Sequence, residues 1–386
     1  MAVAKKPKKP CRNIYEALTL MVLALYVFCY VRFYKKGDRF RSTASMYIYS
    51  LSVPVLISMG LVWGTFSIRT SPKYIKYFQE MDTVLMFVVL MDITVAVMSF
   101  LFNAINMQGR SRRHLHIYEH LERIDVQLME EFKAKMCYEK IAFKISIIFW
   151  VFLVYGVTIN SAVISSWSQG DLFKMYIITF CHTFIIFGMH MIVFSFMTVA
   201  DLLRIRFRLL QKLLAPAYLR RHYVDQDVRM SKLRKAVQIY RELYEVIDEV
   251  NSVHGVCLVS CLAHDFTLGT SLLYLMFGRS SNLTVAGDLH LFFGVFLLLL
   301  PPAYKMVMTP VYGMMSWKEG AKCMRIIKLM DDAFPGNSQV RQIVASTLLW
   351  NNHNKYREYK IGPTITSNIS LITAENQIKK FLTAKK

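Results

Sequence analysis

The sequence contains one pattern typical of metal chemistry, two histidines at helical spacing beside a glutamate. His116, Glu119 and His120 fit H-x-x-E-H, in which two imidazoles on one helix face hold zinc. No partner motif or third ligand accompanies this pattern in the sequence. The alternative interpretation is a solvated helix face, because five-residue patterns of this kind also arise by chance. We therefore expect no metal or other cofactor at this position.

Ionisable side chains inside apolar segments form a second group of candidates, because a charge in lipid is costly and usually faces a bundle interior or a cavity. His264 and Asp265 lie near the middle of one apolar run. Lys305 lies at a similar depth in the next run when each is counted from the exterior end. We expect an intramembrane pair between Asp265 and Lys305. The alternative is that Lys305 extends its ammonium group to the cytoplasm.

Further polar side chains fall at mid-depth or in the outer halves of the predicted spans, where they could line a pocket open to the exterior. The ligand-pocket candidates are Asp92, Asn160, His182, Asp265, Tyr274 and His290. The alternative is that each group bonds to a neighbouring helix and holds the bundle together. The sequence shows no nucleophile elbow, phosphate-binding glycine loop or intramembrane di-aspartate pattern, so we do not expect an enzyme.

Long apolar helices must position these side chains. Of the 386 residues 54% are hydrophobic, and the mean hydropathy is positive. A helix needs about 20 mostly apolar residues to cross a hydrocarbon core of roughly 30 Å. Seven runs have this length, and the six that we assign as crossings are 46–66, 84–105, 141–167, 175–200, 253–277 and 289–315. This pattern predicts an all-α, polytopic integral membrane helix bundle.

The distribution of basic residues predicts the orientation, because Lys and Arg concentrate in cytoplasmic loops. If the first run, Ile14–Tyr34, dips into the membrane and returns, the cytoplasmic side carries 40 Lys and Arg and the exterior carries 5. We therefore predict a re-entrant or interfacial helix within a cytoplasmic segment 1–45, with both termini inside. The alternative is a first run that crosses fully, with an exterior N-terminus. The sequon at Asn282 falls in a predicted exterior loop and is a glycosylation candidate.

The cytoplasmic loops carry apolar residues at helical spacing and are predicted to extend the spans as helices. One such segment is His114–Glu139, after the second crossing, and another is Ser231–Glu249, before the fifth. Pro216 and the stretch 225–227 are predicted to break the longest loop into helical parts.

The net charge of +21 does not indicate a nucleic-acid partner. The 47 Lys and Arg lie almost entirely between apolar runs, where they set topology and contact anionic lipid. A nucleic-acid-binding protein would gather them on a soluble face with interleaved aromatics. The seven cysteines are scattered and none lies in a predicted exterior loop, so no disulfide framework is expected.

Four degenerate motifs follow one another along the chain. A short apolar helix and a basic stretch precede the first crossing, and the sequence HLERIDVQL at 120–128 fits L-x-x-I/L-D-x-x-L. Tyr240 and Leu243 lead to Asn251 at the start of the fifth crossing, and Glu319 follows the sixth. In order and spacing these motifs resemble the insect gustatory receptors of the seven-helix insect chemoreceptor superfamily, over about residues 10–360.

The resemblance implies a ligand-gated cation channel subunit that binds small-molecule tastants from the extracellular side. It implies homo- or hetero-tetramers with other gustatory receptors in the plasma membrane of sensory neurons. It also implies a seventh, pore-lining helix, whereas the predicted cytoplasmic tail 316–386 contains no adequate apolar run. We therefore expect a short isoform, an incomplete gene model or a non-conducting partner. The alternative function is a polytopic ion-coupled transporter that uses His264, Asp265 and Lys305.

Overall fold

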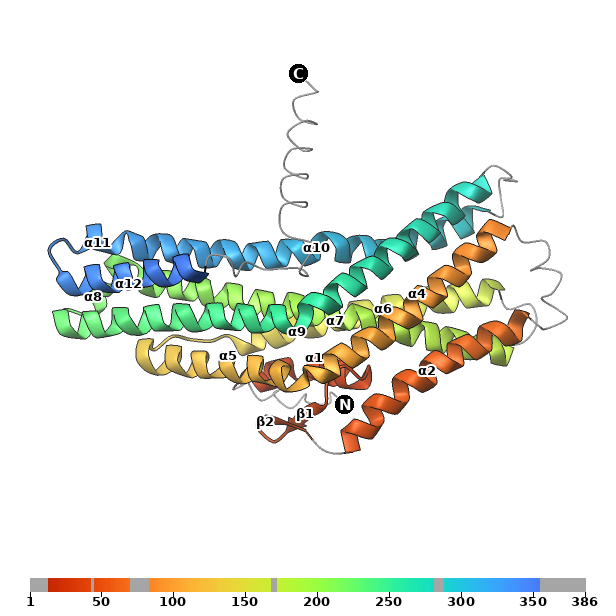
Figure 1. Cartoon of the computed structure of the whole chain (residues 1–386), viewed down its shortest axis with the longest axis horizontal. Coiled ribbons are helices and arrows are strands. Elements are labelled where there is room, and N and C mark those ends of the chain that lie inside the picture. The colour runs from red at the N-terminus through yellow and green to blue at the C-terminus, as the bar shows by residue number, and fades with distance from the viewer. Residues whose placement is uncertain (1–12, 43–44, 70–82, 168–171, 281–287, 355–386) are drawn as a thin grey trace, which may run out of the picture. The chain divides into compact units, whose positions relative to one another are not determined.

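The computed structural model describes residues 13–42, 45–69, 83–167, 172–280 and 288–354, and this part of the chain is mostly helix. The helices are α1 (Ile14–Val27), α2 (Ser45–Arg69), α4 (Thr83–Gly109), α5 (Ser111–Phe132), α6 (Tyr138–Trp167), α7 (Leu172–Leu214), α8 (Pro216–His222), α9 (Gln226–Ser280), α10 (Asp288–Lys328), α11 (Met330–Ala333) and α12 (Ser338–Asn354). Two short strands, β1 (Phe33–Lys36) and β2 (Arg39–Ser42), pair in an antiparallel hairpin (Figure 1).

Five of the described helices are long and apolar enough to cross a bilayer, namely α2, α4, α6, α7 and α9. Their apolar segments overlap the first five predicted crossings. The predicted sixth crossing, 289–315, lies within α10, and several side chains in its outer part fall outside the described residues. The predicted all-α, polytopic membrane bundle is confirmed.

The chain divides into two compact units. Unit 1 consists of Met1–Ser195 and His264–Ala303, and unit 2 consists of Phe196–Ala263 and Tyr304–Lys386. The three boundaries fall inside α7, α9 and α10, so each of these helices contributes residues to both units. The helices α7 and α9 have 43 and 55 residues, which is more than a crossing needs. The predicted helical extension of the fifth span is therefore confirmed.

In unit 1 the helix α1 is apolar and buried. The side chain of Asn13 caps its N-terminus by accepting a hydrogen bond from the backbone N–H of Glu16 at 2.9 Å. Leu18 and Leu25 are fully buried, and α1 packs against α5 and α6. With 14 residues, α1 is about 21 Å long, shorter than a hydrocarbon core of roughly 30 Å. This length is typical of an interfacial or re-entrant helix.

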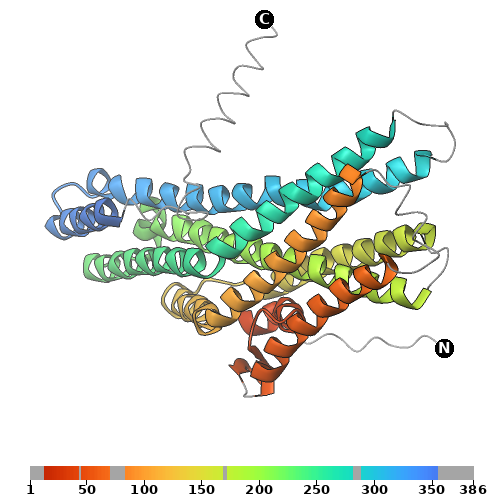
Figure 2. The ribbon, with the colours of Figure 1, turned by 45° about the vertical axis from the view of Figure 1, so that its right-hand side comes forward.

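The hairpin after α1 is an element that the sequence pattern did not predict. Gly37 lies between the strands with a φ of +67°, a left-handed conformation that glycine adopts without steric cost. The rings of Phe33 and Phe40 lie 5.7 Å apart, and both contact the ring of Tyr118 in α5. Figures 1 and 2 both show the hairpin beside α1. The hairpin therefore anchors its basic strands on unit 1 through two phenylalanines.

The predicted helix His114–Glu139 is correct for most of its length and wrong at its end. The helix α5 ends at Phe132, because Lys133 adopts a left-handed conformation with a φ of +52°. A non-helical segment then leads to α6. Across this break Tyr138 donates a hydrogen bond to the buried carboxylate of Asp125 at 2.9 Å. The aspartate of the L-x-x-I-D-x-x-L motif thus ties α5 to α6.

Replacing Tyr138 with phenylalanine is expected to lower the free energy of unfolding by about 1–3 kcal/mol, because a buried carboxylate loses a hydrogen-bond donor. The measurement is thermal or denaturant unfolding of the full chain in detergent micelles. The same replacement at Tyr176, which is 66% exposed, is the control and should change stability little. Equal effects of the two variants would contradict the assignment of this bond as a stabilising contact.

Unit 2 is built around an aromatic core that joins three helices. Phe207 of α7 contacts Tyr240 and Tyr244 of α9, with ring centroids 6.3 and 5.7 Å apart. Trp350 of α12 contacts the same two tyrosines at 6.2 and 6.0 Å. The guanidinium of Arg241 lies 5.8 Å from the centre of the Trp350 ring. These contacts dock α12 on α9, and α9 on α7.

The break predicted near Pro216 is confirmed. Pro216 begins the short helix α8, where its missing N–H is not needed, and α9 begins after a second interruption. Figure 1 shows α8, α11 and α12 gathered at one end of unit 2. The guanidinium of Arg220 donates a hydrogen bond to the carbonyl of Ala333 and lies 5.1 Å from the ring centre of Phe334. In unit 2 the turn between α10 and α12 is therefore bonded to α8.

Candidate functional site

Four ionisable side chains from three helices of unit 1 form a polar cluster, made up of Asp92, His182, His264 and Asp265. His264 and Asp265 are buried and the other two are half-buried, and we call the group the buried polar cluster. Asp92 lies on α4, His182 on α7 and the other two on α9. The ring of His264 is an electrostatic partner of both Asp92 and His182. Its Nδ1 lies 3.7 Å from Oδ1 of Asp265, and both side chains are almost fully buried. Three of the six predicted pocket residues are thus brought together around His264.

Several polar atoms of this buried polar cluster lack hydrogen bonds within the described part of the chain. These atoms are Oδ1 of Asp92 and both ring nitrogens of His264. Buried polar atoms in native proteins nearly always have a partner, which is often a water, an ion or a ligand. A carboxylate and an imidazole can together accept hydrogen bonds, donate them and hold a positive charge. These three atoms are therefore polar groups inside the helix bundle that the described residues leave unsatisfied.

The remaining predicted site residues are placed differently. Tyr274 lies half-buried on α9, nine residues after Asp265. The side chains of Asn160 and His290 lie outside the described residues, as does Asn282. Their assignment as pocket and glycosylation candidates stays a prediction.

Lys305 is 2% exposed and belongs to unit 2, whereas Asp265 is 0% exposed and belongs to unit 1. The predicted pairing of these two side chains stays a prediction.

The histidine pair on α5 is not symmetrical. His116 is exposed and His120 is buried, with ring centroids 5.7 Å apart. The guanidinium of Arg123 lies 3.4 Å from Nε2 of His116. The positive charge of Arg123 beside this nitrogen repels a metal ion and so opposes metal binding by His116.

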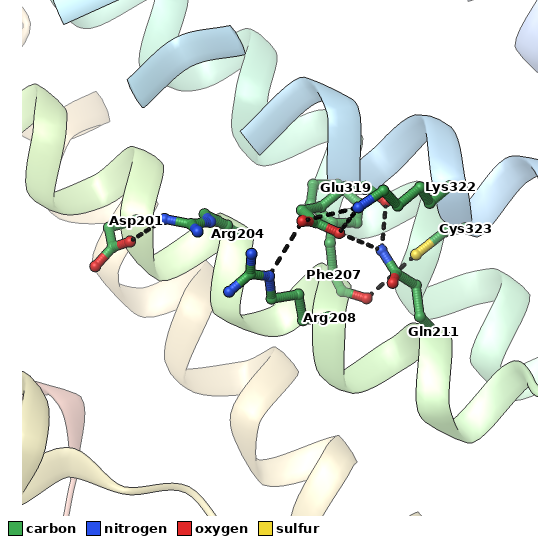
Figure 3. Close-up of polar contacts among 8 residues, drawn as sticks. All are labelled: Asp201, Arg204, Phe207, Arg208, Gln211, Glu319, Lys322 and Cys323. Carbon is green, nitrogen blue, oxygen red and sulfur yellow. Dashed lines mark hydrogen bonds and ion pairs between the residues drawn. The ribbon is translucent and has the colours of Figure 1, made fainter. Parts of the chain in front are cut away.

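Glu319 lies at the centre of a polar contact between α7 and α10 in unit 2. Figure 3 shows its carboxylate between Arg208 and Gln211 of α7 and Lys322 of α10. The Nε of Arg208 donates to Oε1 at 3.1 Å, and Nε2 of Gln211 donates to Oε2 at 2.8 Å. Lys322 lies 3.3 Å from both carboxylate oxygens. We call these four residues the Glu319 joint.

The thiol of Cys323 completes this contact one helical turn after Glu319. Burial raises the pKa of Cys323 to about 12, so the thiol stays protonated at neutral pH. It donates a hydrogen bond to the carbonyl of Phe207 at 3.3 Å. The face of α10 that carries Glu319 is therefore bonded to α7 at two levels.

The charge state of the Glu319 joint follows from its donors. Burial alone would raise the pKa of Glu319, but hydrogen bonds from Gln211, Arg208 and Lys322 outweigh it and hold the pKa below the ordinary 4.5. The carboxylate is therefore ionised at neutral pH.

Glu319→Gln should make the stability of the chain less dependent on acid pH. The folded pKa is depressed, so the contribution of Glu319 is fully present above the ordinary 4.5 and is lost as the pH falls through the folded value. The difference in thermal midpoint between the two chains in micelles should be constant near neutral pH and shrink below 4.5. A difference that persists unchanged in acid would contradict this assignment.

The sequence pattern indicated Glu319 but not its partners. Arg208 and Gln211 lie three residues apart, which places them on one face of α7, and this spacing is the signal that could have found them. Which helix face meets which is decided by tertiary packing, and no local pattern reveals it.

The chain is similar to known proteins over most of its length. The family model of the 7tm chemosensory receptors matches residues 17–357. Gustatory receptor 57a of Drosophila melanogaster is 30% identical over 323 residues, which cover 82% of this chain and 77% of that receptor. Gustatory receptor 47b of the same species is 21% identical over 196 residues, covering 51% of this chain and 46% of that receptor. The resemblance drawn from the four sequence motifs is thereby confirmed, and the chain belongs to the 7tm chemosensory receptor family as a multi-pass membrane protein.

Proposed function

We propose that this chain is a subunit of a ligand-gated cation channel that binds small-molecule tastants from the extracellular side, in the plasma membrane of sensory neurons. The observation that carries the proposal is the buried polar cluster in a chain of the chemosensory receptor family. Asp92, His182 and His264 come from three different helices, so a molecule bound among them would contact all three. Ligand binding could then change how these helices pack.

The test is current recording from cells that express the full chain, alone and together with other gustatory receptors, with which it would form homo- or hetero-tetramers. Sucrose, fructose, quinine, caffeine and dissolved carbon dioxide serve as the probes. We expect one or more probes to evoke a cation current that depends on the chain. Surface expression without any evoked current would contradict the proposal, and ion-coupled uptake of a probe without current would favour a transporter.

The proposed topology has six crossings, a re-entrant α1 and both termini in the cytoplasm. It rests on the short length of α1 and on the distribution of basic residues. The exterior loop then contains Asn282, and the cytoplasmic tail contains Asn368.

Treatment of the expressed chain with an N-glycosidase should therefore increase its mobility in a denaturing gel, and Asn282→Gln should abolish this change. Asn368→Gln is the matched control and should leave the glycan in place. A glycan at Asn368 would reverse the assigned orientation of the tail.

A further inference from the structure

The carboxylate of Glu319 is buried, yet its basic partners remain largely in solvent. Glu319 is 6% exposed, whereas the side chains of Arg208 and Lys322 are 52% and 57% exposed. Gln211 donates to the backbone carbonyl of Glu319 at 2.9 Å as well as to its carboxylate. If α10 moved away from α7, a buried negative charge would lose two donors at once. The contact therefore resists separation of the two helices.

The residue after Glu319 shows how closely the helices approach. A Cβ atom at Gly320 would lie 3.0 Å from Oη of Tyr244 and 3.3 Å from Cζ of Phe207. Both neighbours are aromatic side chains of the unit 2 core, so they have little room to shift. With the thiol of Cys323 bonded to α7, positions 319, 320 and 323 all fix α10. Figure 3 shows the contacts of Glu319 and Cys323 with α7.

The helix α7 carries residues of both sites described above. It is unbroken from Leu172 to Leu214, with His182 of the buried polar cluster near one end and Arg208 of the Glu319 joint near the other. A continuous helix transmits a shift or rotation along its length, because its backbone hydrogen bonds resist local deformation.

From these contacts we infer that the Glu319 joint makes α7 and α10 move together, so that a displacement of α7 caused by ligand is passed to α10. The inference rests on the proposed function, because it assigns a role in channel opening. The buried carboxylate of Glu319 would then serve channel opening as well as stability. The helix α10 follows α7 through charge-assisted bonds rather than through apolar packing alone.

The experiment is a charge exchange in the full chain, with sucrose and quinine as probes. Glu319→Arg places a third cation beside Arg208 and Lys322. Arg208→Glu places a second carboxylate beside Glu319. The double variant restores opposite charges at positions 208 and 319. We expect each single variant to lower the maximal current per receptor at the cell surface at least fivefold, and the double variant to recover it to within twofold. Lys318→Glu, an exposed neighbour on α10, is the control and should leave the current unchanged.

Other outcomes overturn the inference. Fewer receptors at the surface, with unchanged current per receptor and unchanged half-maximal probe concentration, would mean that the joint serves stability only. Losses in the single variants that simply add in the double variant would mean that the two side chains do not act as a pair. If a single variant does not reach the surface, Glu319→Gln replaces it, since it removes the charge and keeps the shape. Unchanged maximal current per receptor in Glu319→Gln would then overturn the inference. An unaltered chain without evoked current would overturn the proposed function and the coupling role with it.

Discussion

Replacing Gln108 with leucine is expected to lower the free energy of unfolding by about 3–6 kcal/mol, because two buried carbonyls and a half-buried guanidinium lose their partner. Gln108 is 4% exposed at the end of α4. Its Nε2 donates to the carbonyl of Cys29 at 2.9 Å and to the carbonyl of Ser50. Its Oε1 accepts a hydrogen bond from the guanidinium of Arg32 at 3.1 Å. One side chain thus ties α4 to α2 and to the chain that leaves α1.

The surroundings of Gln108 explain why water cannot easily replace it. The guanidinium of Arg32 lies 3.6 Å from the ring centre of Tyr47. The backbone N–H of Arg32 donates a hydrogen bond to the hydroxyl of Ser111 at 3.0 Å. Leucine fills the volume of the glutamine but satisfies none of the three groups, so the desolvation cost of each remains.

The matched control is Gln127→Leu on α5. Gln127 is half-buried, and its Oε1 makes no hydrogen bond within the described residues, so the same change should cost less than about 1 kcal/mol. The measurement is denaturant unfolding of the full chain in micelles, followed by helical circular dichroism. Equal losses of unfolding free energy at the two positions would show that the hydrogen bonds of Gln108 do not stabilise the fold more than those of an ordinary half-buried glutamine.

The contacts of Gln108 also show what the sequence could and could not predict. Runs of more than 20 apolar residues predicted the crossings, because the thickness of the bilayer dictates their length. Proline at 216 predicted a helix boundary, because its ring and missing N–H act locally. The path of the chain after α1 could not be predicted, because Cys29 adopts a φ of +65° and its carbonyl bonds to Gln108, 79 residues away. The hairpin was missed because its strands are short and charged.

The sequence predicted how deep in the membrane the candidate site residues lie, but not which of them face one another. Counting residues from the exterior placed Asp92, His182 and Asp265 inside their spans, and the structure places all three around His264. A mostly apolar helix has a weak amphipathic signal, so the pattern did not show which polar residues face one another. Tyr274, in the same predicted group, lies more than two turns further along α9.

Asp92→Asn is the second change for which we expect a large effect, and it acts on function. Asparagine keeps the size of the side chain and cannot carry a charge, so the electrostatic contact with His264 is lost. Such contacts are strong in a bundle interior, where the effective dielectric constant is low. We expect the sucrose or quinine concentration that gives half-maximal current to rise at least about tenfold, which corresponds to about 1.4 kcal/mol of binding free energy.

The control for Asp92→Asn lies two residues further along the same helix. Thr94 is exposed and donates its hydroxyl to the carbonyl of Leu90 at 2.7 Å, so Thr94→Val removes a polar group of α4 outside the buried polar cluster. Currents are divided by the amount of each variant at the cell surface, which separates ligand response from folding. A shift caused by Asp92→Asn alone would place the ligand among Asp92, His182 and His264. Equal shifts in both variants would move the ligand site elsewhere in the bundle and leave the cluster a contact between helices.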